Sequence, residues 1–204
     1  MEPKERILVK ANELFNRYGI RSVSMDDIAA QLGMSKKTLY HYYADKDELV
    51  NAVFDILLDQ NRNQCMACAK AGENAIHEVF LSFDMFRDLL AVMNPALIFD
   101  MQKYHPTAYR KFQEFRSGFL YKMIRNNLER GIQEDIYRPE IDTDVLTRYR
   151  LYTVLLSLDS EVFPSNRTNL VRIEEALMDV FLFGIANTKG QKLIRKYKNQ
   201  RTKN

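Results

Sequence analysis

The sequence predicts an all-α fold built mainly of long helices. Only 7 glycines and 5 prolines occur in 204 residues, too few for an all-β or loop-rich chain. Apolar residues make up 46% of the chain and recur at helical spacing as far as about residue 188, so a sizeable core can form. The helical pattern is interrupted at Gly72, Asn94-Pro95, His105-Pro106, residues 137–144 and residues 163–169.

The N-terminal residues predict three short, capped helices. The first carries an apolar stripe made of Ile7, Ala11, Leu14, Phe15 and Tyr18. Gly19 ends this helix, and Ser24 with Asp27 forms an S-x-x-D capping box at the start of the second. Ser35 caps the third helix, and only residues 33–35 separate it from the second. Two helices joined by so tight a turn predict a helix-turn-helix.

The third predicted helix carries side chains suited to double-stranded DNA. Lys36, Lys37 and Thr38 lie in its first turn, where lysine can donate to guanine and threonine can contact a base edge. Tyr40 and Tyr42 follow, with hydroxyls that can reach phosphate oxygens. Ser24 and Lys46 occupy the N-termini of two other helices, which favour phosphate. Residues 1–50 carry eight basic and eight acidic groups, so the placement of charge, not its total, must attract DNA.

Residues 19–50, "GIRSVSMDDIAAQLGMSKKTLYHYYADKDELV", resemble the DNA-binding signature of the TetR family of bacterial transcriptional regulators. The resemblance implies an all-α protein of about nine helices, a homodimer on a palindromic operator, and a C-terminal ligand pocket that controls DNA affinity. It divides the chain into a DNA-binding domain (1–46), an effector-binding and dimerisation domain (47–188) and a basic tail (189–204). The base-contacting roles fall on Lys36, Lys37, Thr38 and His41, and the phosphate roles on Ser24, Met25, Tyr40, Tyr42 and Lys46. Met25 could serve only through its backbone amide, and Tyr43 stands where the family usually has phenylalanine.

Two predicted helices near 143–163 and 168–188 have broad apolar faces. In the family the last two helices usually form a four-helix bundle with those of a second copy. The resemblance therefore implies a dimer interface at Tyr149, Leu156, Leu170, Leu177 and Phe181. The alternative is that these faces are consumed in the core of one chain. A dimer would set two recognition helices about 34 Å apart, on successive major grooves.

The segment 80–123 is rich in phenylalanine, tyrosine and methionine. Such side chains form plain core, but they also line pockets for apolar ligands, where methionine gives adaptable walls. Candidate ligand contacts are Phe83, Phe86, Met101, Tyr104, Phe112, Phe115, Phe119 and Tyr152. We expect a small effector of apolar or aromatic character; an inward Arg116, Arg148 or Arg150 would favour an acidic one.

Cys65 and Cys68 lie three residues apart, on one face of a helix. They cannot form a disulfide framework, and zinc needs four ligands, so a structural role is favoured over a redox or metal role. The sequence predicts no metal and no cofactor. The tail carries seven basic and no acidic residues, and is either a solvated end of the last helix or a phosphate contact.

The predicted function is that of a transcriptional regulator, most simply a repressor released from its operator by the effector. No membrane span or signal peptide is evident, so a cytoplasmic protein is expected. A scaffold for a protein partner, with DNA binding serving localisation, is the alternative. No nucleophile–base pair, metal cluster or glycine-rich phosphate loop suggests an enzyme.

Overall fold

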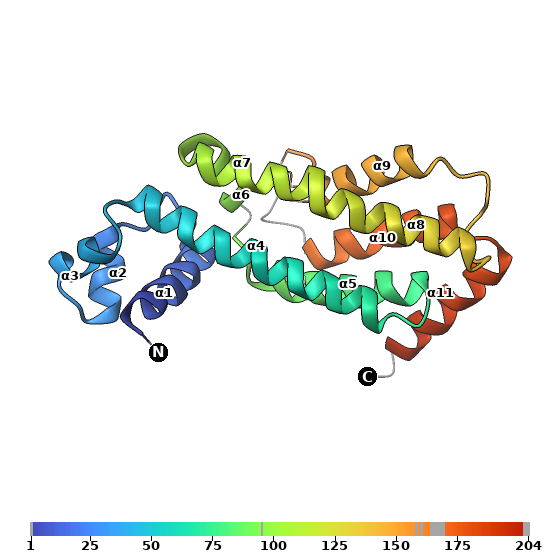
Figure 1. The fold of residues 1–204 in the computed structure, drawn as a ribbon, viewed down its shortest axis with the longest axis horizontal. Coiled ribbons are helices and arrows are strands. Elements are labelled where there is room, and N and C mark those ends of the chain that lie inside the picture. The colour runs from blue at the N-terminus through green and yellow to red at the C-terminus, as the bar shows by residue number, and fades with distance from the viewer. Residues whose placement is uncertain (1, 95, 158, 160, 164–169, 202–204) are drawn as a thin grey trace. The chain divides into compact units, whose positions relative to one another are not determined.

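The computed structural model describes residues 2–94, 96–157, 159, 161–163 and 170–201. These residues form eleven α-helices and one π-helical turn, and the only β-type pairing among them is an isolated bridge between Tyr137 and Ala186 (Figure 1). The all-α prediction is confirmed. The elements are α1 (Pro3–Tyr18), α2 (Met25–Leu32), α3 (Lys36–Tyr42), α4 (Lys46–Ala71), α5 (Ala75–Val92), α6 (Ala96–Tyr104), α7 (Pro106–Glu114), η1 (Phe115–Leu120), α8 (Tyr121–Gln133), α9 (Thr143–Leu156), α10 (Leu170–Ile185) and α11 (Thr188–Arg201).

The chain divides into two compact units, each with its own hydrophobic core. Unit 1 comprises residues 1–61 and 92–115, and unit 2 comprises residues 62–91 and 116–204. The sequence placed a domain boundary after residue 46, but α4 begins there and runs without interruption into unit 2. The functional division at residues 46 and 188 remains a prediction.

Unit 1 packs the three N-terminal helices against the start of α4 and against α6. Its core contains Ile7 and Phe15 of α1, Ile28 of α2 and Leu39 of α3, all at most 1% exposed. Met101 of α6 closes the same core. The apolar stripe read from the sequence is therefore the buried face of α1, except that Tyr18 at its end is 51% exposed.

In unit 2, the turn at residues 136–137 packs against two glycines, Gly131 and Gly190. Residues 136 and 137 follow α8, and the Tyr137 ring packs directly over Gly131 of that helix. Ile136 O accepts a hydrogen bond from Asn187 N at 3.1 Å and lies against Gly190 of α11. Arg138 N in turn donates to Ile185 O at 2.9 Å, so the turn ties α8 to the end of α10.

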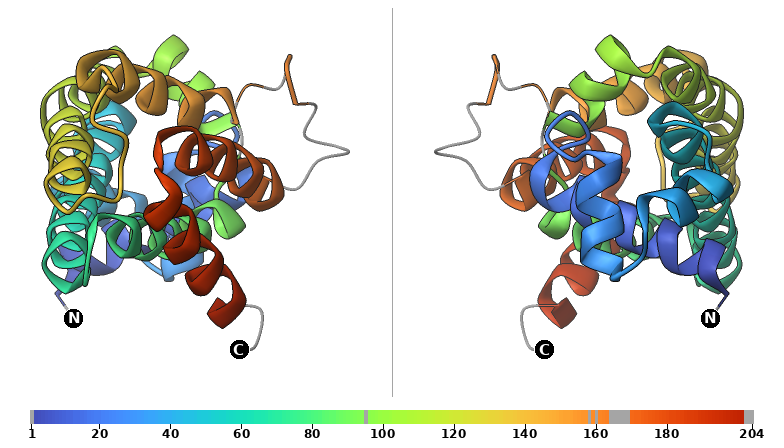
Figure 2. Two further views of the ribbon diagram at one scale, coloured as in Figure 1. Left: turned by 90° about the vertical axis from the view of Figure 1, so that its right-hand side faces the viewer. Right: turned by 90° about the vertical axis from the view of Figure 1, so that its left-hand side faces the viewer.

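The basic C-terminal segment is a packed helix, which corrects the prediction of a solvated end. Figures 1 and 2 show α11 as a separate helix that changes direction after α10. Its Ile194 and Tyr197 are buried in the core of unit 2, and Tyr197 stacks on His77 with 4.7 Å between ring centroids. Its basic residues Lys198 and Arg201 form ion pairs with carboxylates of unit 2. Periodicity missed this helix because charged residues outnumber its buried positions.

Two other helices are shorter than the sequence predicts. The helix expected over 143–163 ends at Leu156, and the one expected over 168–188 spans Leu170–Ile185. Residues 158, 160, 168 and 169, which fall within the two predicted ranges, and residues 164–167 between them lie outside the described residues.

Candidate nucleic-acid interface and effector domain

The α2–turn–α3 segment has the geometry of a helix-turn-helix. Gly33 ends α2 in the left-handed conformation (φ 63°), and its N–H bonds to the carbonyls of Ala29 and Ala30. A side chain at this backbone angle is disfavoured, which explains why glycine stands here. The chain then enters α3 at Lys36 after only two further residues.

Both helices begin at the side-chain caps that the sequence predicts. Asp27 N donates to Ser24 Oγ at 3.1 Å, and Ser24 N donates to Asp27 Oδ2 at 2.8 Å. Ser24 Oγ also donates to Asp27 Oδ2 at 2.6 Å, and this bond together with the one from Ser24 N holds the pKa of the Asp27 carboxyl below its usual value. Thr38 N donates to Ser35 Oγ at 3.1 Å, so Ser35 fixes the first turn of α3. The predicted capping box is therefore formed on both sides.

The recognition helix separates its core residues cleanly from its exposed ones. Leu39 is fully buried, while Lys36, Lys37, Thr38, Tyr40 and His41 are exposed. Helical spacing predicts this division, because Leu39 is the apolar position that faces α1 and α2. The base-contacting candidates thus share the solvent side of α3, which is where a major groove would be read.

Lys36 and Lys37 differ in their surroundings. Lys36 Nζ forms an ion pair with Asp26 Oδ2 of α2 at 2.5 Å, with both side chains largely exposed. Lys37 is exposed and makes no hydrogen bond or ion pair with any residue in the described part of the chain. Lys37 is therefore free to reach a base, whereas Lys36 must first leave a carboxylate. The sequence did not indicate this pairing.

The residues predicted to contact phosphate differ in their exposure and in the charges around them. Tyr40 is 47% exposed, while Tyr42 is half-buried and packs on the core of unit 1. Met25 is 5% exposed, so its side chain belongs to the core and only its backbone amide can serve. Burial lowers the pKa of Lys46, opposed by the nearby carboxylates of Asp100, Asp27 and Asp47. The lysine at the start of α4 therefore sits in an acidic setting.

Asp100 is a residue of this region that the sequence analysis missed. It is 6% exposed on α6, and its Oδ2 accepts a hydrogen bond at 3.0 Å from the backbone N–H of Arg21. Gly19, at φ 81°, lies so close that an added Cβ would stand 3.2 Å from the same oxygen. Asp100 thus fixes the turn that leads into Ser24. The available signal was a carboxylate at a buried position of the otherwise apolar stretch "ALIFDM".

Tyr43 yields a stability prediction. Its side chain is 2% exposed, and its hydroxyl has no hydrogen-bond partner in the described structure. We expect Tyr43→Phe to leave the free energy of unfolding unchanged or to raise it by up to about 1 kcal/mol, because an unpaired buried hydroxyl is removed. Tyr197→Phe is the matched control, since its hydroxyl accepts from Asn74 at 2.8 Å and donates to Glu73 at 3.1 Å. Urea denaturation should show the control less stable; a comparable loss in both variants contradicts the prediction.

The candidate ligand residues are divided between the two units. Met101, Tyr104, Phe112 and Phe115 belong to unit 1, and the others to unit 2: Phe83, Phe86, Phe119 and Tyr152. Met101 is fully buried and Phe83 is 3% exposed, each within the core of its own unit. Both side chains therefore pack within a core, and their role as ligand contacts stays a prediction. Tyr152, by contrast, is 62% exposed.

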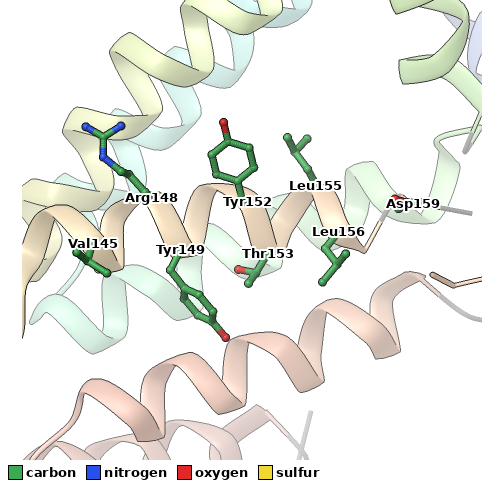
Figure 3. A pocket seen from close by; sticks show the side chains of 8 residues that line it. All are labelled: Val145, Arg148, Tyr149, Tyr152, Thr153, Leu155, Leu156 and Asp159. Atoms are coloured by element: carbon green, nitrogen blue, oxygen red, sulfur yellow. The ribbon is translucent and has the colours of Figure 1, made fainter. Parts of the chain in front are cut away.

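An open groove of about 600 Å³ runs along α9. Figure 3 shows that Tyr149, Thr153 and Leu156 point toward α10, while Arg148 and Tyr152 point to the other side of α9. Its lining residues are Val145, Arg148, Tyr149, Tyr152, Thr153, Leu155, Leu156 and Asp159. The lining thus includes two predicted interface residues, Tyr149 and Leu156, and the predicted ligand residue Tyr152, which points to the opposite side of α9.

The predicted interface residues on α10 differ in accessibility. Leu170 and Leu177 are partly exposed, whereas Phe181 is 4% exposed and stacks on Tyr149 at 6.3 Å between ring centroids. Phe181 is therefore buried within the single chain, and its role at an interface stays a prediction. Val180, the preceding residue of α10, is 65% exposed.

The cysteines of α4 have the properties of structural thiols. Burial raises the pKa of Cys65 to about 11, and burial also raises that of Cys68. A protonated thiol is a poor nucleophile. Among the described residues, no cluster of three or more His, Cys, Asp or Glu side chains is arranged to hold a metal ion.

We therefore expect slow alkylation of Cys65 by iodoacetamide at about pH 8, rising as the pH approaches the raised pKa. Urea-unfolded protein is the control, because its thiols have ordinary pKa values. Mass spectrometry would report labelling at each cysteine. Equal rates in folded and unfolded protein contradict the expectation.

No described helix is long and apolar enough to cross a membrane.

A helix-turn-helix with an exposed basic recognition face, followed by a larger helical domain, defines a DNA-binding transcriptional regulator. A family model for bacterial regulatory proteins of the tetR family matches residues 7–53. An uncharacterized HTH-type transcriptional regulator of Bacillus subtilis (strain 168), YvaF, is 30% identical over 182 residues, 89% of this chain and 94% of the relative. The chain belongs to the TetR family.

Two further relatives extend the comparison. The HTH-type transcriptional repressor KstR2 of Mycobacterium tuberculosis (strain ATCC 25618 / H37Rv) is 27% identical over 158 residues, 74% of this chain and 78% of the relative. The crystal structure of the regulator FadR from Bacillus subtilis in complex with stearoyl-CoA superposes with a TM-score of 0.67 at 19% identity. That match covers 89% of this chain and 98% of the FadR chain, and it shows a shared fold.

Proposed function

We propose that this regulator is a dimeric repressor that binds a palindromic operator and is released from it by a small-molecule effector. The observation that carries the proposal is the exposed Lys37 on the solvent face of α3, beside Thr38 and Tyr40; it pairs with no residue in the described part of the chain. These side chains provide base and phosphate contacts in the order that a recognition helix needs.

The exposed apolar face of α9 and α10 supports dimerisation. Val145 is 57% exposed, Tyr149 43%, Leu156 38% and Val180 65%. Apolar side chains gathered on neighbouring helices mark an interaction surface. A second copy of the same face is the partner proposed, since a two-fold dimer matches a palindromic site.

The link from α6 to the helix-turn-helix supports effector control. Asp100 of α6 holds the Arg21 amide in the turn before Ser24, and its charge also acts on Lys46. A ligand that moves α6 would therefore disturb two phosphate-binding positions at once. Because binding equilibria are linked, the effector weakens DNA binding by the same factor as DNA weakens effector binding.

The effector proposed has a largely apolar body. The exposed aromatic Tyr152 and the neighbouring Tyr149 and Leu156 give the α9 groove an apolar lining. The similar FadR structure was solved with stearoyl-CoA, a ligand with a long apolar chain, which accords with this class.

Fluorescence anisotropy on the DNA upstream of the protein's own gene tests the proposal. We expect tight binding to that DNA, weak binding to a scrambled duplex of equal length, and a loss of selectivity when one half of the palindrome is scrambled. The salt dependence should give a slope of about 0.9 for each phosphate contacted. Equal, weak binding to both duplexes, repeated on DNA from the neighbouring genes, would count against the proposal.

A further inference from the structure

A buried ion pair joins α9 to α10 inside unit 2. Arg150 Nη2 lies 2.6 Å from Glu174 Oε1, and the two side chains are 12% and 0% exposed. The sequence analysis named Arg150 among arginines that, if inward, would favour an acidic effector. The structure turns it inward but supplies its counter-charge, so the pair is neutral as a whole.

The pair leaves hydrogen-bonding capacity unused. Beyond the ion pair itself and the neighbouring Ser157 hydroxyl, Arg150 Nη1 and both oxygens of Glu174 are buried and have no hydrogen-bond partner in the described structure. Burial raises the pKa of Glu174, and Arg150 and the Ser157 hydroxyl oppose this rise; the same hydroxyl donates to Val154 O at 2.7 Å, so it is shared between two acceptors. Buried polar groups in proteins are nearly always satisfied, and a buried ion pair without further hydrogen bonds is a poor source of stability. The Arg150–Glu174 pair is therefore better suited to binding a polar ligand group than to stabilising the fold.

Phe181 lies between a residue of the α9 groove and this pair. Tyr149, which lines the groove, stacks on one aromatic neighbour, Phe181, and the Arg150 guanidinium lies 5.7 Å from the centroid of the same ring. Thr153, also in the groove, donates its hydroxyl to Arg150 O at 3.0 Å. A ligand with its body in the groove thus has the polar pair within one side-chain layer.

We propose that Arg150 and Glu174 form the polar end of the effector site, and that they bind a neutral head group, a hydroxyl or a carboxamide, on an apolar or aromatic body. Such a head accepts a hydrogen bond from Arg150 Nη1 and donates one to Glu174. A carboxylate head group would be repelled by the Glu174 carboxylate. A head group without a hydrogen-bond donor would leave the Glu174 oxygens without a partner. This assignment rests on the proposed function; in the proposed dimer the second copy would close the groove over the ligand.

Three aromatic probes of similar size test the head group. They are 2-naphthol (donor and acceptor), 2-methoxynaphthalene (acceptor only) and 2-naphthoate (anionic). We expect 2-naphthol to bind the full-length protein roughly tenfold more tightly than either of the others, measured by calorimetric titration and by the rise in Tm. Tighter binding of 2-naphthoate, or no binding of any probe, overturns the assignment.

The double variant Arg150→Met/Glu174→Leu separates binding from packing. We expect it to fold with a Tm at or above that of the unmodified protein and to bind 2-naphthol and 2-methoxynaphthalene equally. Arg125→Gln/Glu129→Gln is the control, since it removes an exposed arginine–carboxylate pair on α8 and should keep the preference for 2-naphthol. A large fall in Tm in the Arg150 variant, or an unchanged preference, overturns the assignment.

Binding of each sample to upstream and scrambled DNA is measured in parallel. Selective DNA binding by a protein that lacks the 2-naphthol preference would refute this site alone. If the unmodified protein binds upstream and scrambled DNA equally, the proposed function itself is refuted.

Discussion

Gly131→Ala is expected to cause a large loss of stability. A Cβ at this position would stand 2.0 Å from Cδ2 and 2.2 Å from Cε2 of Tyr137. The ring cannot withdraw easily, because Tyr137 is 1% exposed and its hydroxyl donates to Asn127 Oδ1 at 3.2 Å. Overpacking of this kind costs about 3 kcal/mol or more when neither side can give way.

The displaced ring would also strain the junction of three helices. Asn127 donates its Nδ2–H to Ala75 O at 2.9 Å, which fixes the start of α5 against α8. The residue after Tyr137, Arg138, donates its backbone N–H to Ile185 O at the end of α10. A shift at Gly131 therefore propagates to α5 and α10 rather than remaining local.

Gly118→Ala is the matched control for this prediction. A Cβ at Gly118 meets no side chain or other element within 4 Å. Because alanine favours helical backbone by about 1 kcal/mol over glycine, we expect equal or slightly greater stability. Thermal and urea unfolding would measure both variants; a Gly131→Ala protein as stable as Gly118→Ala would show that the Tyr137 ring is not confined.

The sequence predicts the DNA-binding region well because its signals are local. Caps at Ser24 and Ser35, the glycine turn at Gly33 and the buried Leu39 each depend on residues within one or two helical turns. Local chemistry of this kind can be read from spacing alone. The exposed positions of α3 follow by exclusion.

The features that the sequence missed depend on contacts between separate segments of the chain. Asp100 bonds to Arg21, 79 residues away, and the Lys36 partner Asp26 lies across the turn. Arg150 and Glu174 meet only when α9 and α10 pack together. Charged residues at such positions look like solvated surface in a periodic pattern, because periodicity does not report partners. α11 was misread for the same reason.

Lys37→Ala is expected to weaken operator binding by about 1–3 kcal/mol, the value of a good base contact in the major groove. Lys37 is exposed, lies in the first turn of α3 and has no partner to leave among the described residues. Its loss removes no core contact, so the free energy of unfolding should not change. If it reads a base, the loss should be large on the operator and small on a scrambled duplex.

Lys36→Ala should have a smaller effect on the same operator. Lys36 must give up its 2.5 Å ion pair with Asp26 before it can contact DNA, and an exposed pair of this kind contributes little to stability. Removing the lysine also leaves the Asp26 carboxylate unneutralised on the DNA-facing helices, which would repel phosphate. The effect should therefore appear on both duplexes and flatten the salt slope by about one phosphate.

Anisotropy titrations of the two variants on operator and scrambled DNA, at two salt concentrations, distinguish the roles. Lys10→Ala is the control, because Lys10 forms a comparable ion pair with Glu13 on α1, outside the helix-turn-helix. We expect Lys37→Ala to reduce the ratio of operator to scrambled affinity and Lys36→Ala to preserve it. Should Lys37→Ala weaken both duplexes equally, Lys37 contacts phosphate, and base reading must come from Thr38 or His41 instead.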